Sequence, residues 1–179
     1  MNQFILLKKE KINSLNQKIG LNSNILVYLI SYPIIYKKQL EKIFNNKGVF
    51  YIHALSLKKD IEIQKVLKRD YSYKEKEIKS KIKDFLKKRN IEIVPINKEK
   101  RELAREREKI CNENNISIHP PDSIIISDFV EHGITKVFSE DGTFVRASNF
   151  IGLPAEQILF KFDKKIQKEL GKLKHFKIN

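Results

Sequence analysis

The chain has 179 residues, 41% of them hydrophobic and 32% charged. This is enough apolar material for one compact domain with an appendage, and it excludes a wholly disordered protein. The 36 Lys and Arg outnumber the 22 Asp and Glu, so the formal net charge is +14. Such a charge attracts polyanions, and nucleic acid is therefore the first class of partner that the composition indicates. A generic basic surface is the alternative that charge alone leaves open.

The sequence also indicates a compartment. Cys111 is the only cysteine and cannot form an internal disulfide, which favours a reducing, cytoplasmic environment. The apolar run at residues 4–7 is too short for a signal peptide. The longest apolar stretch, residues 25–36, is interrupted by Ser31 and Pro33, and it is shorter than the roughly 20 residues that a membrane-spanning helix needs. We therefore expect a cytoplasmic protein without a membrane partner.

The first half of the chain alternates strand-like and helix-like patterns. Residues 19–24 read as a buried strand that enters a polar turn, and the apolar residues 25–29 follow. Residues 49–52 are rich in β-forming residues and predict a second strand. A helix is expected over residues 57–67, and a second, lysine-rich helix has an apolar stripe over residues 78–86.

The second half continues this alternation. Residues 91–96 predict a third strand, and residues 98–112, where charges of both signs mix, predict a helix. Asp122 follows two prolines and is expected to start the next helix by accepting hydrogen bonds from free backbone amides. Gly133 suits the end of that helix. Residues 134–138 then predict a fourth strand.

Two further features complete the chain. Asp141 and Gly142 are expected to form a turn after the fourth strand, and Pro154 is expected to open a last helix. The alternating order predicts an α/β fold in which a parallel sheet has helices on both faces. We expect residues 1–160 to form this domain and residues 161–179 to form a Lys-rich C-terminal helix.

An acidic segment interrupts the basic chain. Between residues 122 and 141 the only Lys or Arg is Lys136, whereas the segment holds the carboxylates Asp122, Asp128, Glu131, Glu140 and Asp141. Asp122 begins a helix and Asp141 follows a strand, so both are expected at the carboxyl ends of the parallel strands. Two carboxylates there suit Mg²⁺ or Mn²⁺, which can activate water at a phosphodiester. The alternative is that Asp122 only caps its helix and Asp141 only forms a turn.

The segment from Asp122 to Phe144 resembles the C-terminal half of a PIN domain, the nuclease family that includes VapC-type toxins and RNA-processing endonucleases. In that family an Asp opens a helix, a Gly ends it, a strand follows, and a Thr or Ser precedes a final Asp and Phe. Ser139, Asp141 and Phe144 stand at those last positions. Residues 21–28 are similar to the family's first strand and its Asp-Thr-Asn turn. The resemblance covers residues 17–160.

The resemblance implies a Rossmann-like α/β fold in which three or four acids hold one or two Mg²⁺ or Mn²⁺ ions and RNA is hydrolysed. It makes Asp122 and Asp141 catalytic metal ligands. Asn22 stands where the family has its first Asp, and Lys59 stands where it has a Glu. A shift of the alignment by one residue brings Asp60 to that place. The implied metal ligands are therefore Asp122, Asp141, Asn22 and Asp60.

Three further residues have supporting positions in this resemblance. Asn24 matches the polar residue of the first turn, Ser139 matches the hydroxyl beside the last Asp, and Glu140 is the neighbouring acid. The altered ligands at positions 22 and 59 lower the attraction for a metal ion, because one charge is lost and another is reversed. Two interpretations stay open: a metal-dependent endoribonuclease, and a catalytically degenerate PIN fold that serves as an RNA- or protein-binding module.

A basic segment follows the second predicted strand and is expected to bind RNA phosphates. Its residues are Lys58, Lys59, Lys65, Lys68 and Arg69. A solvated helix face is the alternative, because acidic residues interleave farther along. A protein partner or a homodimer is also left open. None of the four histidines has the short paired spacing of a zinc site, so His53 and the others are expected in loops or on the surface.

Overall fold

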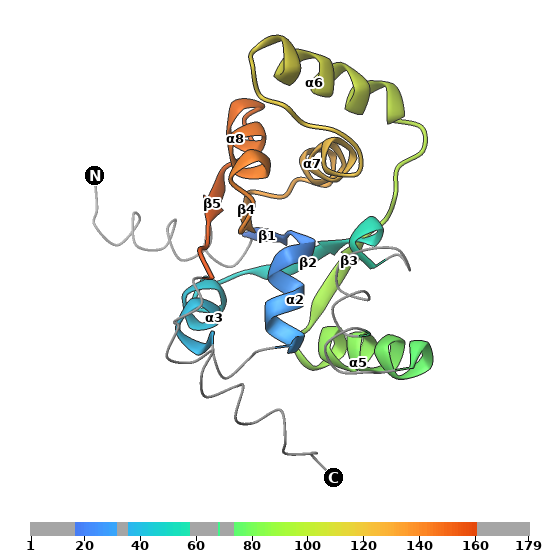
Figure 1. Ribbon diagram of the computed structural model, residues 1–179, viewed down its shortest axis with the longest axis vertical. Helices are drawn as coiled ribbons and strands as arrows, with labels where there is room; N and C mark the ends of the chain where they lie inside the picture. Colours follow the sequence, from blue (N-terminus) through green and yellow to red (C-terminus); the bar gives the residue numbers. More distant parts are fainter. Residues whose placement is uncertain (1–16, 32–35, 58–67, 69–73, 161–179) are drawn as a thin grey trace, which may run out of the picture.

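A computed structural model of the protein describes residues 17–31, 36–57, 68 and 74–160. Its centre is one sheet of five parallel strands in the order β3-β2-β1-β4-β5 (Figure 1). The strands are Lys18–Leu21 (β1), Val49–His53 (β2), Ile91–Val94 (β3), Lys136–Ser139 (β4) and Ala155–Gln157 (β5).

Helices cover both faces of this sheet, which confirms the predicted fold class (Figure 1). One side carries α2 (Ser23–Ser31), α3 (Lys37–Phe44) and α5 (Glu75–Lys88). The other side carries α6 (Arg101–Glu113), α7 (Asp122–Glu131) and α8 (Gly142–Phe150), and the short 3₁₀ turn η1 (Ala54–Leu57) follows β2. Within the described residues, no helix is long and apolar enough to cross a membrane.

Strand β1 lies in the middle of the sheet and is buried on both sides. Ile19 and Leu21 face the core beneath α2, α3 and α5, whereas Gly20 faces α7. A Cβ atom at position 20 would lie only 2.9 Å from Cε2 of Phe129, so a glycine lets α7 approach the strand this closely. Ile19, Leu21 and Phe129 have no exposed surface. Burial of each such side chain contributes roughly 1.5–3 kcal/mol.

Most of the predicted elements are confirmed, with shifted ends. The second, third and fourth strands overlap β2, β3 and β4, and the lysine-rich helix is α5. The first strand is shorter than predicted: it ends at Leu21, and α2 begins at Ser23. Gly133 follows α7 with a φ of +73°, a conformation in which a glycine is favoured. The helix expected over residues 57–67 and the C-terminal helix expected over 161–179 lie outside the described residues, apart from Leu57 in η1.

Two predictions after β4 are wrong. Asp141 and Gly142 do not close a turn but start α8. Residues 155–157 do not continue a helix from Pro154 but form β5 at the edge of the sheet. The local residues suit a helix, yet β4 has backbone groups that need partners: Val137 N donates to Pro154 O over 2.8 Å, and Ile158 N donates to Ser139 O over 2.8 Å. These tertiary hydrogen bonds override the local propensity.

Helix α6 is tied to α7 by charged hydrogen bonds. Lys100 Nζ and Arg107 Nη2 both donate to the carboxylate of Glu131, the latter over 2.9 Å. Arg107 Nη1 also donates to Ser127 Oγ over 2.7 Å. The hydrogen bond from Lys100, followed by that from Arg107, holds the pKa of Glu131 below its usual value. The ionised carboxylate of Glu131 therefore stabilises the folded state more than the protonated form does.

This link predicts a pH-dependent contribution to stability. The pKa of Glu131 is lower in the folded state, so its contribution is complete above the unfolded value of about 4.3 and is lost as pH falls through the folded value. We expect Glu131→Gln to lower the free energy of unfolding by about 1–2 kcal/mol near neutral pH and to have little effect at about pH 3. Urea unfolding at both pH values measures this. Glu113→Gln, at an exposed pair with Lys109, is the matched control. An equal cost of Glu131→Gln at both pH values would contradict the assignment.

Candidate functional site

The carboxyl ends of β1 and β4 meet at the point where the strand order reverses. β1 pairs with β2 on one side and with β4 on the other, so the connections leave the sheet in opposite directions here. Asn22 directly follows β1, and its backbone N donates to Phe138 O over 3.0 Å. Open α/β sheets bind their ligands at such a reversal. This edge is therefore the candidate functional site.

Three polar residues converge here on the hydroxyl group of a fourth. Ser139 Oγ lies 3.0 Å from Asn22 Nδ2, 3.3 Å from Asn24 Nδ2 and 3.0 Å from Asp141 N. Ser139 is fully buried and ends β4. We refer to Asn22, Asn24, Ser139 and Asp141 as the Ser139 cluster. It joins the residues that follow β1 to the residues around the end of β4, so the structure brings together four of the predicted site residues.

The orientation of the Asn22 amide follows from its neighbour. The backbone N–H of Ser23 can only donate, and it lies 2.6 Å from Asn22 Oδ1. Ser23 Oγ lies 3.3 Å from the same oxygen. The amide nitrogen of Asn22 must therefore point toward Ser139. The side chain is 3% exposed and is satisfied by protein partners at both ends.

Asp141 has a structural role in addition to its predicted one. Its Oδ1 accepts hydrogen bonds from Thr143 N over 2.7 Å and from Phe144 N over 3.2 Å, and thereby caps α8. Such a cap stabilises a helix by about 1 kcal/mol. The residue is exposed, and in the described part of the chain Oδ2 has no protein partner. One oxygen of Asp141 is therefore available to a ligand from solvent.

Glu140 is held beside the Ser139 cluster by α2. Its Oε2 accepts a hydrogen bond from Tyr28 Oη over 2.5 Å, and its backbone N donates to Asn24 Oδ1 over 3.2 Å. The ring of Tyr28 stacks on Phe160, with centroids 4.1 Å apart. The Glu140 carboxylate is thus turned toward α2. Tyr28, which donates to it, is itself held by the contact with Phe160.

Asp122 is the first residue of α7, and the expectation that it caps the helix is wrong. The capping position is occupied by Pro121, which has no side-chain acceptor. The backbone carbonyl of Pro121 instead accepts from Ile124 N and Ile125 N. A carboxylate in the first turn still interacts favourably with the helix dipole. The Ser139 cluster, as far as the structure describes it, does not include Asp122, so its convergence with Asp141 stays a prediction.

The described residues do not by themselves fit a metal ion. Within residues 17–31, 36–57, 68 and 74–160, no group of three His, Cys, Asp or Glu could hold one. The oxygen of Asn22 is used by Ser23. Lys59 and Asp60 lie outside the described residues, so the ligand set of Asp122, Asp141, Asn22 and Asp60 stays a prediction.

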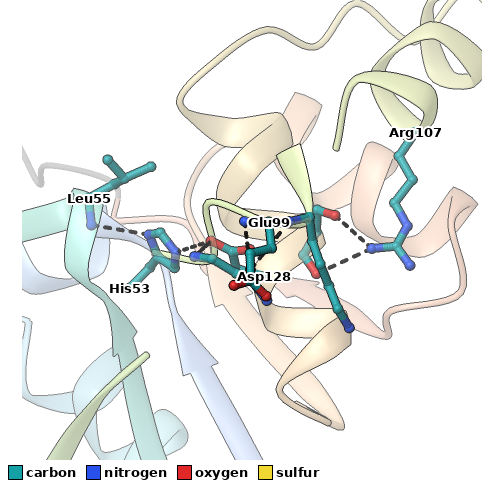
Figure 2. Close-up of polar contacts among 8 residues, drawn as sticks. His53, Leu55, Glu99, Arg107 and Asp128 are labelled. Atoms are coloured by element: carbon teal, nitrogen blue, oxygen red, sulfur yellow. Dashed lines mark hydrogen bonds and ion pairs between the residues drawn. The ribbon is translucent and has the colours of Figure 1, made fainter. Parts of the chain in front are cut away.

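A second polar network, beside the end of β2, was missed in the sequence. His53 is not in a loop or on the surface but ends β2 and is fully buried. Its Nδ1 accepts from Leu55 N over 3.1 Å, so Nε2 carries the proton and donates to Asp128 Oδ2 over 2.8 Å (Figure 2). Asp128 is 4% exposed and also accepts from Asn97 N over 3.2 Å. The sequence offered one indication of this contact: Asp128 is an acidic residue among the apolar residues of α7.

This network positions α7 relative to the sheet. Asp128 connects it to β2 through His53 and to the loop after β3 through Asn97. Asn97 Oδ1 accepts in turn from the backbone N of Glu99 and Lys100, next to the start of α6. Figure 2 shows His53 and Asp128 pointing toward one another, with Arg107 reaching α7 from the other side. The placement of Asp122 at the start of α7 depends on these contacts.

Loss of the Asp128 carboxylate is expected to destabilise the fold. Asp128→Ala leaves His53 Nε2–H and Asn97 N–H buried without an acceptor, and should lower the free energy of unfolding by about 3 kcal/mol. Asp128→Asn keeps an acceptor oxygen and should cost less. Asp84→Ala removes an exposed carboxylate whose hydrogen-bond partner within the described residues is Ser80, and should cost about 0.5 kcal/mol or less. Chemical denaturation compares the three, and similar costs for Asp128→Ala and Asp84→Ala would refute the role of the network.

Comparison with known proteins gives a consistent picture. The chain matches the family model of the PIN domain over residues 20–149. A similar solved structure is that of VapBC2 from Rickettsia felis bound to a DNA fragment from its promoter, with a TM-score of 0.56 and 23% sequence identity. The match covers 79% of this chain and 98% of that chain, and at this identity it supports the fold. A comparison with curated proteins finds no significant match. Because the family model spans more than half of the chain, the protein belongs to the PIN domain family of nucleases.

Proposed function

We propose that this protein is a catalytically degenerate PIN domain that binds RNA. The observation that carries the proposal is the orientation of Asn22, whose amide nitrogen donates to Ser139 Oγ at the position where the family resemblance has a carboxylate. An amide N–H repels a cation, whereas a carboxylate attracts it. At 4 Å, one lost charge changes the energy of a metal ion by about 1 kcal/mol in water and about 4 kcal/mol at intermediate dielectric.

Burial favours a neutral residue over a charged one at position 22. An ionised carboxylate at position 22 would be almost fully buried, and such a group needs a cation or several hydrogen bonds. The neutral amide of Asn22 is instead satisfied by Ser23 and Ser139. The cluster therefore holds β1, β4 and the start of α8 together through protein contacts.

The charge of the chain supports RNA as the partner. The formal net charge is +14, and binding to the phosphate backbone is the expected use of such an excess. Lys68 is exposed, while Lys58, Lys59, Lys65 and Arg69 lie outside the described residues and stay predictions. A protein partner or a homodimer is the other class left open. The similar solved structure is a VapBC2 complex, which makes a protein partner worth testing in the same assay.

The metal-dependent endoribonuclease is the second candidate. It is favoured by the exposed Oδ2 of Asp141 at the strand reversal, where a ligand would bind. In that case Asp122 and Asp141, with Asp60, would hold Mg²⁺ or Mn²⁺, which supplies an activated water and neutralises phosphate charge. The two candidates differ in whether the unmodified chain cleaves RNA.

The test uses the full chain and a labelled single-stranded RNA in Mn²⁺, in Mg²⁺ and in EDTA. We expect binding that weakens steeply as salt is raised, and no cleavage above that of Asp141→Asn. Asn is also a good helix cap, so this variant retains α8 while it loses a charged ligand. Cleavage that requires Mn²⁺ and is abolished in Asp141→Asn would overturn the degenerate site and establish the nuclease. An absence of RNA binding even at low salt would overturn the choice of partner.

A gain-of-function variant tests whether the residues at positions 22 and 59 are what weakens metal binding. Asn22→Asp combined with Lys59→Glu changes the local charge by three units and replaces the amide donor. We expect this variant to bind Mn²⁺ by calorimetry at least tenfold more tightly than the unmodified chain. Asn45→Asp combined with Lys47→Glu makes the same charge change at two exposed residues outside the site and is the control. Equal Mn²⁺ affinity of the two double variants would show that positions 22 and 59 do not control the metal.

A further inference from the structure

Helix α5 exposes a row of lysines that, among the described residues, no carboxylate neutralises. Its apolar residues Ile78 and Ile82 are buried against the core, so the opposite face is open to solvent. On that face lie Lys76, Lys83 and Lys87, which we call the lysine row. Their spacing of seven and four residues places them along one side of a helix. At 1.5 Å per residue, the row spans roughly 16 Å.

Two acids of α5, Glu77 and Asp84, lie to one side of this row. With 100° between successive residues, Glu77 and Asp84 are rotated by roughly 60–100° from the mean direction of the three lysines. Asp84 instead accepts from Ser80 Oγ. In the part of the chain that the structure describes, no member of the lysine row is within ion-pair distance of a carboxylate. The other exposed helix α3 differs, because Lys37 pairs with Glu41 and Lys42 pairs with Glu156.

An unpaired row of like charges is unfavourable in the isolated helix. Lys83 and Lys87 are four residues apart and repel one another. Phosphate groups of a polyanion would relieve this repulsion and release counterions. The rise between Lys83 and Lys87 is about 6 Å, comparable to the spacing of neighbouring phosphates in an extended strand.

We propose that the lysine row of α5 is a docking surface for the phosphate backbone of a single-stranded RNA. This inference rests on the proposed RNA binding and names a surface for it. The C-terminal end of α5 leads through Asn90 into the start of β3, so Lys87 lies toward the amino ends of the strands. The Ser139 cluster is at their carboxyl ends. The helices of the α5 side are separated by the sheet from α6, α7 and α8 (Figure 1). Substitutions in the row therefore leave the candidate functional site intact.

The test compares two triple variants of the full chain with the same change of charge. Lys76→Gln, Lys83→Gln and Lys87→Gln neutralise the row, and Gln preserves helix propensity. Lys38→Gln, Lys47→Gln and Lys98→Gln neutralise three exposed lysines outside α5, for which the described part of the chain shows no carboxylate partner. Fluorescence anisotropy with labelled oligouridine over a range of KCl concentrations gives the affinity and its salt dependence. Circular dichroism and urea unfolding establish that both variants are folded.

We expect the row variant to lose roughly tenfold or more in affinity at low salt. The slope of log affinity against log salt should fall by about 2, since each single-strand phosphate contact contributes about 0.7. The control variant should change the slope by much less. Equal losses in both variants would overturn the lysine row while leaving RNA binding in place, because net charge alone would then explain it. No binding by the unmodified chain would overturn both proposals. Binding of the row to anionic phospholipid vesicles but not to oligouridine would also overturn it.

Discussion

The parallel pairing of β1 with both β2 and β4 is the constraint on which the rest of the structure depends. This strand has only four residues, and both of its edges and both of its faces are in use. Ile19 and Leu21 fill one core, while Gly20 lets Phe129 of α7 lie against the other face. The register of β1 against β4 places Leu21 beside Phe138, so the next residue, Asn22, reaches Ser139. A shift by one residue would turn every side chain to the opposite face.

At the edge built by this pairing, hydrogen bonds connect the residues after β1 to those after β4. Ser139 accepts from the side chain of Asn22 and from the backbone N of Asp141, and Asp141 caps the helix that follows. The resemblance to PIN nucleases predicts clustered acids at this place. Position 22 holds a neutral, nearly fully buried amide, and its nitrogen and oxygen both have protein partners. A carboxylate at this position would attract a cation, whereas the amide forms hydrogen bonds within the protein instead.

Helix α7 is held by polar contacts on three sides as well as by its apolar face. Asp128 binds the buried His53 and the backbone of Asn97, Ser127 accepts from Arg107, and Glu131 accepts from Lys100 and Arg107. Buried polar groups of this kind are costly if any partner is missing, so they favour one placement of the helix over others. The same contacts position Asp122 at the start of α7, so an electrostatic network remote from the Ser139 cluster still influences the geometry of the site.

The lysine-rich helix α5 shows how one sequence pattern serves two purposes. Ile78, Ile82 and Leu86 recur at helical spacing and are buried against the core. The lysines between them are necessarily exposed, because an amphipathic helix has only one apolar stripe. The helical periodicity does not predict whether these lysines form ion pairs. That depends on which acidic residues the neighbouring elements place close to them. For α3 the partner Glu156 comes from β5, more than a hundred residues away.

The sequence by itself determined the α/β class, most of the strands, the amphipathic helices and the Asp122–Phe144 motif, because these are encoded in local periodicity and in spacing along the chain. Only the tertiary structure decided that residues 155–157 form a strand, since the unpaired edge of β4 outweighs local helix propensity. It also decided the burial of His53 and its bond to Asp128, 75 residues away. The same holds for the amide of Asn22 meeting Ser139 across 117 residues. Such contacts depend on sheet register and helix packing, which bring together residues that are far apart in the sequence. The local sequence around either residue does not predict its partner.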